Sequence, residues 1–174
     1  MNPIHKFMND ISIKGLICLD AGTGTGGMTR YLVRKGAKFV YSVSNNEEYL
    51  DYARSNCSTN ELRKIKFINT DLSDLNFLSV ESVNLITAHM LINLVSPIKL
   101  FLIFKELTRA ARKGCLLIII DYNPFFTYQM DRSYLIEELF RIENAIHYLV
   151  EGEPAMIWYP SEYIIIYYSF WAGN

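Results

Sequence analysis

Several classes of protein are excluded by what the 174-residue sequence lacks. Its three cysteines, Cys18, Cys57 and Cys115, lie far apart, with no C-x-x-C pair and no neighbouring histidine, so neither a zinc site nor a disulfide framework is expected. No apolar run approaches the roughly 20 residues that a membrane-spanning helix needs. The N-terminus also lacks the long apolar core of a secretory signal. These absences favour a protein of the reducing cytoplasm without a metal centre.

An excess of positive charge is also missing. The formal net charge is −1 at pH 7, which gives no sign of the basic surface that nucleic-acid-binding proteins present. With 5 prolines, 9 glycines and 51% hydrophobic residues, the composition is that of a globular protein rather than a disordered chain. The length suits a single domain over residues 1–174.

Short apolar segments alternate with helical patterns along most of the chain. The run GLICLD at residues 15–20 is apolar up to its final aspartate, which is typical of a strand buried on both faces. Similar segments and the patterns between them predict further strands at 38–44, 65–71, 83–88 and 115–121, and helices at 27–36, 45–56, 96 to about 111, and 133–150. Strands that alternate with helices in this way form a parallel sheet with helices on both faces.

The last part of the sequence departs from this alternation. The segments PAMIWY and YIIIYYSFW are rich in β-forming residues, and only PSE stands between them. Because so short a connection leaves no room for a crossover helix, the two strands must pair antiparallel. The predicted fold class is therefore α/β, with a doubly wound, mostly parallel, seven-stranded sheet that ends in a C-terminal antiparallel hairpin.

The segment LDAGTGTGGMTR, residues 19–30, follows the first predicted strand and fits two binding motifs. Gly22, Gly24 and Gly27 have the G-x-G-x-x-G spacing of a dinucleotide-binding turn. Asp20 and the glycines at 22, 24 and 26 have the D-x-G-x-G-x-G spacing of the turn that S-adenosylmethionine (SAM) methyltransferases carry in the same place. The glycines alone do not decide between these ligands, because many turns between a strand and a helix need them.

Two acidic residues favour SAM. Asp20 stands at the carboxyl end of its strand, where a carboxylate would oppose a pyrophosphate but suits the positive charge of a sulfonium or an ammonium group. Asp71 follows the third predicted strand, where its carboxylate can accept a hydrogen bond from an adenine amino group. The C-terminal hairpin is also an unusual ending for a dinucleotide domain.

The order of these pieces resembles the class I SAM-dependent methyltransferases over residues 15–171. LICLDAGTGTGG is similar to the first motif of that family, IKFINTDLSDLNF to its adenine segment, and FKELTRAARKGCLLIIID to its helix, glycine turn and fifth strand. The resemblance implies a SAM-dependent methyltransferase with a Rossmann-like fold, in which the glycine turn holds the aminocarboxypropyl group. The cofactor-binding residues it implies are Asp20, Gly22, Thr23, Gly24, Gly26, Ser44, Asn45, Asp71, Leu72 and Ala88.

The end of the second strand departs from the family pattern. Members usually carry an acid there that holds both ribose hydroxyls, but this chain has Ser44, Asn45 and Asn46. Neutral side chains lack the charge-assisted grip of a carboxylate, so weaker ribose contacts are expected. A 2′-phosphate at this place would need a nearby arginine, and the closest in sequence, Arg54, lies ten residues on. Asn84 likewise replaces the aspartate common at the start of the fourth strand.

Candidate catalytic residues follow the fourth and fifth predicted strands, whose carboxyl ends face the methyl group in this architecture. His89 can serve as a general base for a protonated acceptor, or can be a rim histidine bound to backbone. Asp121 and Tyr122 can orient an acceptor, or can cap the strand end. The triplet NPF at 123–125 matches the N-P-P-[FY] motif of amino-directed nucleic-acid methyltransferases poorly, since it lacks one proline and follows the fifth strand instead of the fourth.

Little of the sequence is left to cover such a site. Residues 1–14 form a short N-terminal segment whose apolar residues have helical spacing and predict a lid helix: Ile4, Phe7, Met8 and Ile11. A sparsely covered site favours a large acceptor such as a protein, a partner subunit, or a second copy of the chain, whereas neither a membrane nor a nucleic acid is expected as a partner.

The function that these features predict is methyl transfer from SAM to an acceptor that the sequence does not name. One alternative is a non-catalytic binding or scaffold subunit with the methyltransferase fold, suggested by Ser44, Asn84 and the sparse cover. A nucleotide-dependent oxidoreductase is a third interpretation, since the glycine spacing also fits a dinucleotide.

Overall fold

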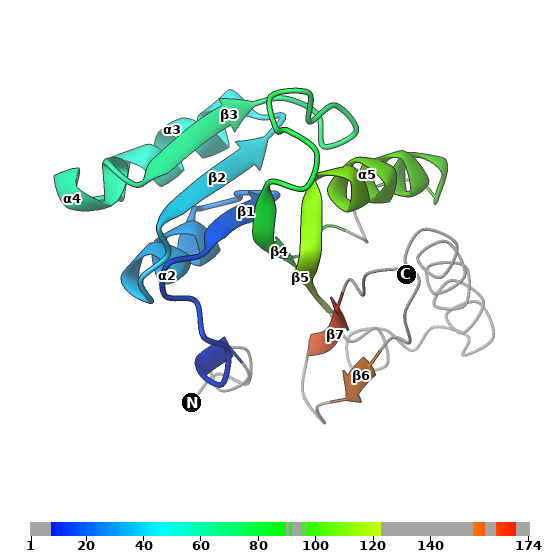
Figure 1. Cartoon of the computed structure of the whole chain (residues 1–174). Helices are drawn as coiled ribbons and strands as arrows, with labels where there is room; N and C mark the ends of the chain where they lie inside the picture. The colour runs from blue at the N-terminus through cyan, green and yellow to red at the C-terminus, as the bar shows by residue number, and fades with distance from the viewer. Residues whose placement is uncertain are drawn as a thin grey trace.

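The computed structural model describes residues 8–89, 91, 95, 97–122, 155–158 and 163–169. Their strands form one seven-stranded sheet in the order β3-β2-β1-β4-β5-β7-β6 (Figure 1). The strands are β1 (Ile17–Ala21), β2 (Phe39–Ser44), β3 (Ile65–Asn69), β4 (Val83–His89), β5 (Ala111–Tyr122), β6 (Ala155–Trp158) and β7 (Tyr163–Ser169). The helices are α2 (Gly27–Arg34), α3 (Glu47–Ser55), α4 (Thr59–Leu62) and α5 (Pro97–Ala110). Among these residues, none of the helices has both the length and the apolar surface that crossing a bilayer requires.

Strands β1 to β5 pair in parallel, which confirms the predicted α/β class. Strand β1 is the middle one of the five parallel strands and pairs with β2 on one side and with β4 on the other, so the chain changes direction across the sheet at this strand. The loops that leave the carboxyl ends of two such strands diverge, and ligands bind in the crevice between them. Beyond β5, strand β7 pairs antiparallel with both β5 and β6. The helix predicted at 133–150 lies outside the described residues.

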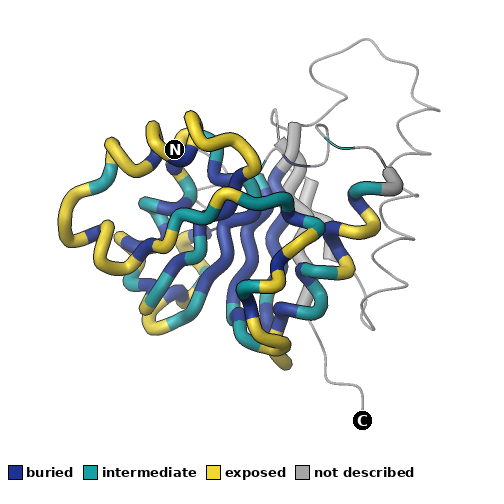
Figure 2. Tube along the Cα trace, turned by 90° about the horizontal axis from the view of Figure 1, so that it is seen from above, coloured by how far each residue is buried: buried dark blue, intermediate teal, exposed yellow. Residues whose placement is uncertain are grey.

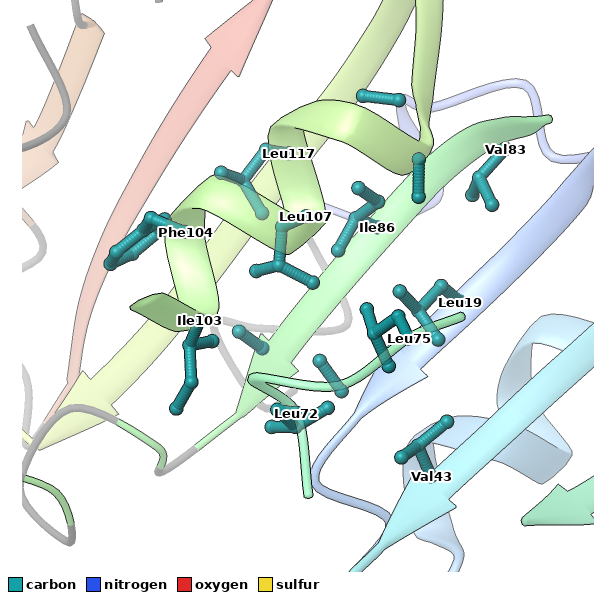
Figure 3. Close-up of a cluster of buried hydrophobic side chains, with 14 of the residues drawn as sticks. Leu19, Val43, Leu72, Leu75, Val83, Ile86, Ile103, Phe104, Leu107 and Leu117 are labelled. Carbon is teal, nitrogen blue, oxygen red and sulfur yellow. The ribbon is translucent and has the colours of Figure 1, made fainter. Parts of the chain in front are cut away.

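Buried side chains cover both faces of the sheet. On one face, Leu19 of β1 belongs to a cluster with Phe104 and Leu107 of α5 (Figure 3). On the other face, Cys18 of β1 belongs to a second cluster with Leu32 of α2. Adjacent residues of β1 thus point into opposite layers, as the pleat of a strand requires. The buried central strands lie between more exposed outer segments (Figure 2).

Strand β5 begins earlier than the sequence predicts. Ala111 pairs with Val83, and the next pair in register joins Leu85 to Leu116, so extra residues bulge from β5 between the two pairs. Gly114 has a φ of +75°, a left-handed conformation that suits the bulge. The predicted end of the helix near residue 111 is confirmed, since α5 ends at Ala110. The predicted strand start at 115 is wrong, because pairing with β4 extends the strand backwards.

The described part of the N-terminal segment packs on α2. Met8 and Ile13 are buried in the same cluster as Leu32. Asn9 Oδ1 accepts a hydrogen bond from Lys35 Nζ at 2.6 Å, which ties the segment to the end of the helix. Residues 1–7 lie outside the described part of the chain, and the predicted lid helix stays a prediction.

Gly26, the N-cap of α2, is the position where we expect a small substitution to disturb packing most. Its φ is +76°, and a Cβ built there would lie 2.7 Å from Ala53 Cβ in α3. Gly26→Ala should therefore cost roughly 1–2 kcal/mol in left-handed strain, and more where α3 has to move. Urea unfolding measures this loss.

The matched control is Gly27→Ala, since a Cβ at Gly27 meets no atom within 4 Å. Alanine is favoured over glycine in helices, so this variant should be as stable as the parent or more stable. Equal stability of the two variants would contradict the assignment of Gly26 to packing.

Candidate functional site

A pocket of about 390 Å³ lies where the loops leave the carboxyl ends of the central strands. Its volume falls within the range of ligand sites, roughly 300–1,000 Å³. Seven of the residues that the sequence predicts for a site line it: Gly22, Gly24, Ser44, Asn45, Asp71, Leu72 and His89. The structure thus brings together the ends of four strands that are far apart in the sequence.

The pocket also has lining residues that the sequence analysis missed. They come from the glycine turn, the start of α3, the loop after β3, and the segment from β4 into α5: Thr25, Tyr49, Thr70, Leu91, Val95, Lys99 and Ile103. Tyr49 could have been found, because it lies in the first turn of the helix that follows the second strand. Lys99 carries no sequence signal, since only the folded chain brings α5 to the pocket.

Backbone hydrogen bonds hold the glycine turn on β2. The amides of Gly22 and Thr23 both donate to the Val43 carbonyl, at 3.0 and 2.9 Å. Gly22 and Gly24 have φ values of +92° and +48°, which glycine adopts without a steric penalty. A Cβ on either glycine would meet no atom within 4 Å. Because both line the pocket, the turn leaves space for a ligand to approach its backbone closely.

A network of buried side chains lies beneath the turn. Asp20 is fully buried, and its two carboxylate oxygens accept hydrogen bonds from Thr29 Oγ1 at 2.5 Å and from Thr87 Oγ1 at 3.2 Å. Ser42 Oγ lies 2.7 Å from Thr29 Oγ1 and 2.8 Å from Thr23 Oγ1, within hydrogen-bond distance of both. The network therefore joins β1, β2, β4 and the first turn of α2 to the glycine turn itself.

Asp20 does not line the pocket, although the sequence analysis places it against a positive charge of the ligand. Complete burial raises the pKa of its carboxyl group to about 7, against the opposing effect of the hydrogen bonds from Thr29 and Thr87. This position favours an indirect role, in which the side chain holds the turn. Thr23, Gly26 and Ala88, also implied as cofactor residues, are buried and do not line the pocket either.

The polar residues at the end of β2 divide into two kinds. Ser44 Oγ accepts a hydrogen bond from the Asn46 amide at 3.1 Å, and Asn46 Oδ1 accepts one from the Tyr49 amide at 3.3 Å as the N-cap of α3. These two side chains therefore accept hydrogen bonds from neighbouring backbone amides. Asn45 is exposed and lines the pocket, and Tyr49 lines it from α3 with 52% of its surface exposed.

Two residues that the sequence raised lie away from the pocket: Asn84, a departure from the family pattern, and Arg54, the arginine nearest in sequence to the end of β2. Asn84 Oδ1 accepts a hydrogen bond from the Ile17 amide at 3.0 Å, near the amino ends of β4 and β1. Arg54 forms an ion pair with Asp51 on the exposed side of α3. Neither Asn84 nor Arg54 lines the pocket, so neither bears on a ligand there.

Asp71 lines the pocket after β3, and both oxygens of its carboxylate accept hydrogen bonds. Its Oδ1 accepts hydrogen bonds from the Ser73 amide at 3.0 Å and from the Ser73 hydroxyl at 2.7 Å, and its Oδ2 accepts one from the Lys99 ammonium group of α5. Partial burial alone would raise the pKa of Asp71, but the donors Lys99 and Ser73 outweigh it and lower the pKa to about 2. The carboxylate is therefore ionised at physiological pH.

The three candidate catalytic residues come to one edge of the sheet. His89 ends β4 and lines the pocket, and burial lowers its pKa, which favours the neutral imidazole at pH 7. Asp121 and Tyr122 end β5, and the pairing of His89 with Ile120 places their backbone beside it. The side chains of Asp121 and Tyr122 lie outside the described part of the structure.

The raised pKa of Asp20 has a measurable consequence for stability. The folded chain retains a proton on this carboxyl group up to about pH 7, whereas the unfolded chain releases it near the ordinary aspartate pKa of 3.8. The free energy of unfolding should therefore fall as pH rises from 4 to 7, by an amount on the order of 3 kcal/mol.

Asp20→Asn provides the comparison, because the amide has a similar shape but does not titrate in this range. Unfolding in urea at pH 5 and pH 8 should show the parent protein losing stability relative to this variant as pH rises. A difference that stays constant, or that grows in favour of the parent, would contradict the burial of an ionisable group beneath the turn.

The sequence matches proteins of known class over the part that forms this site. A model of the methyltransferase domain family matches residues 18–114, which is more than half of the chain and runs from β1 into β5. Ribosomal protein L11 methyltransferases of Thermoanaerobacter sp. (strain X514) and Thermoanaerobacter pseudethanolicus are each 33% identical to it over 67 residues. That segment is 38% of this chain and 22% of the length of those relatives.

Solved structures extend the likeness over nearly the whole chain. An S-adenosylmethionine-dependent methyltransferase from Mesorhizobium loti has a TM-score of 0.75 at 16% identity and covers 96% of both chains. A SAM-dependent methyltransferase from Aquifex aeolicus has a TM-score of 0.71 at 22% identity, over 97% of this chain and 89% of the other. These structures share the fold, and together with the match over residues 18–114 they lead to one conclusion: the chain belongs to the methyltransferase domain family.

Proposed function

We propose that the pocket binds SAM and that the protein is a SAM-dependent methyltransferase. The observation that carries this proposal is the open glycine turn. Gly22 and Gly24 present bare backbone to a pocket that also contains the ionised carboxylate of Asp71. A turn that is open toward the pocket lets a ligand pack against its backbone. An ionised carboxylate can accept a hydrogen bond from an amino group of that ligand.

The residues present fit the parts of SAM. The backbone of Gly22 and Gly24 would hold the amino acid portion, and the carboxylate of Asp71 would accept a hydrogen bond from the adenine amino group. Asn45 and Tyr49 line the pocket between the glycine turn and Asp71, and would hold the ribose hydroxyls. Asp20 acts through the buried threonines and fixes the turn without a direct contact.

Bound SAM supplies an electrophilic methyl group on its sulfonium. Because the methyl group moves by in-line displacement, the main task of the protein is to align an acceptor with it. His89 lines the pocket, and burial lowers its pKa and so favours the neutral imidazole, which would act as the base for an acceptor that arrives protonated. Asp121 and Tyr122 at the neighbouring strand end would orient that acceptor. An acceptor that is already an anion needs alignment alone.

The cytoplasm is the compartment we propose. Cys18, Cys57 and Cys115 are all free, as expected where thiols stay reduced. Burial raises the pKa of Cys18 and of Cys115 to about 12, so neither thiol offers a nucleophile.

For the acceptor, we propose a large molecule such as a protein. The curated relatives, which match 67 residues of this chain, are described as methyltransferases of a ribosomal protein. Transfer of labelled methyl from SAM into a size-fractionated cell extract should label a protein-sized fraction. Label found only in small molecules would contradict the proposed acceptor but not the enzyme.

Substitution of Gly24 tests the cofactor site. A leucine there would fill the space against the turn, so Gly24→Leu should weaken S-adenosylhomocysteine binding at least 100-fold in calorimetric titration. Left-handed backbone at φ +48° should also cost roughly 1–2 kcal/mol of stability.

Gly15→Leu is the matched control for that strain. Gly15 has a φ of +80°, has open space around its Cβ position, and precedes β1 at the end opposite the glycine turn. It should lose similar stability and keep its affinity. Unchanged affinity in Gly24→Leu would overturn the assignment of the ligand.

Asn45 tests the expected weak ribose contact. Asn45→Asp introduces a carboxylate next to Ser44, the position at which the family usually carries one, and should preserve the affinity for S-adenosylhomocysteine or tighten it by up to roughly 1.5–3 kcal/mol. Asn46→Asp is the control, since aspartate also caps helices and adds the same charge outside the pocket. A large loss of affinity in Asn45→Asp alone would indicate that an anionic group of the ligand lies there.

A further inference from the structure

Lys99 reaches the pocket from α5 and contacts the carboxylate that the proposed function assigns to adenine. We propose that Lys99 is a positioning residue for cofactor specificity: it fixes the Asp71 carboxylate so that the site accepts a purine with a 6-amino group and rejects one with a 6-oxo group. This inference rests on the proposed function, because it deepens the role of the same site.

The Asp71 carboxylate has one acceptor position left for a ligand. A carboxylate offers about four lone-pair positions. Oδ1 uses two of them for the amide and the hydroxyl of Ser73, at 3.0 and 2.7 Å, and Oδ2 uses one for Lys99. One acceptor position on Oδ2 therefore stays available for a ligand.

Lys99 also fixes the orientation of the Asp71 carboxylate. Ser73 follows Asp71 by two residues, so its two hydrogen bonds restrain only the local loop. Lys99 lies 28 residues further along the chain, in the first turn of α5, and holds the other oxygen from a different element. Ile103, one turn beyond Lys99, is buried in the core cluster beneath α5 together with Leu72 (Figure 3). The lysine therefore reaches Asp71 from a helix that is anchored in the core.

A carboxylate held in this way discriminates between purine bases. The Asp71 carboxylate, kept ionised by Lys99 and Ser73, can only accept hydrogen bonds. A 6-amino group donates to its open position. A 6-oxo group instead places a second acceptor against a carboxylate that Lys99 holds in place. The N1–H donor that a 6-oxo purine gains could reach this carboxylate only if the base or Asp71 shifted. Recognition by fixed polar groups of this kind discriminates more strongly than recognition by shape.

The test compares two ligands that differ in the 6-substituent of the purine and the proton on N1: S-adenosylhomocysteine and its inosine analogue, titrated calorimetrically into the full chain. The parent should bind the adenine ligand at least tenfold more tightly. Lys99→Met should weaken the adenine ligand several-fold and leave the inosine ligand within about twofold, so the ratio of the two affinities falls. Lys99→Arg, which retains a donor, should restore most of that ratio.

Two controls separate this role from a structural one. Lys105→Met removes an exposed lysine of the same helix outside the pocket, and should change neither affinity. In an Asp71→Asn background, Lys99→Met should have little further effect on the adenine ligand, since Lys99 acts through that carboxylate. Thermal melting monitors folding, and Lys99→Gln replaces Lys99→Met if the latter is unstable.

Each result decides the proposal. An equal loss for both ligands in Lys99→Met would overturn it in favour of a general structural or electrostatic role. A larger loss for the inosine ligand would overturn it in favour of direct contact between Lys99 and the base. If neither ligand binds the folded parent, the proposed function fails as well, whereas binding of both with an unchanged ratio refutes the role of Lys99 alone.

Discussion

The buried carboxyl group of Asp20 is the constraint on which the site depends. It is fully buried in β1, where it accepts hydrogen bonds from the hydroxyls of Thr29 of α2 and Thr87 of β4 and from the Thr29 backbone amide. A buried polar group without partners would cost several kcal/mol, so these contacts fix how the strand, the helix and the neighbouring strand meet. Ser42 extends the network to Thr23, and thereby fixes the glycine turn from below. Because these hydrogen bonds hold the turn on the side that faces the sheet, its other side can stay open to the pocket.

The two ends of the pocket differ in how they are built. Buried hydrogen bonds hold the glycine turn in place, and its backbone lines the pocket. This arrangement suits a part of the ligand that always has the same shape. The end at Asp71 is partly exposed and uses charges from two separate elements, which suits recognition of one functional group. Asn45 and Tyr49 also line the pocket and have neutral polar side chains, so we expect the strongest ligand interactions at the two ends.

Much of the fold follows from local patterns, and less of the site does. The parallel strands and the glycine turn have strong signals, because apolar runs and φ-demanding glycines are local features. The start of β5 at Ala111 and the contact of Lys99 with Asp71 have none, since both depend on partners distant in sequence. For the same reason the sequence did not show that Asn84 accepts a hydrogen bond from the Ile17 amide. Nor does any motif show that Asp20 is buried. Ser44 and Asn84, which suggested a scaffold protein, are used locally or lie away from the pocket, so they give no support to that alternative.

The central claim is that SAM binds between the glycine turn and Asp71. Backbone NMR during titration with S-adenosylhomocysteine tests it most directly, because it reports both affinity and location. The account predicts saturable shifts of the amides of Gly22, Gly24, Asn45 and Leu72, with none of comparable size at Gly15 or Gly114, and no saturable response to NADH. Saturable shifts with NADH, or a response to S-adenosylhomocysteine that leaves the glycine turn unchanged, would contradict it.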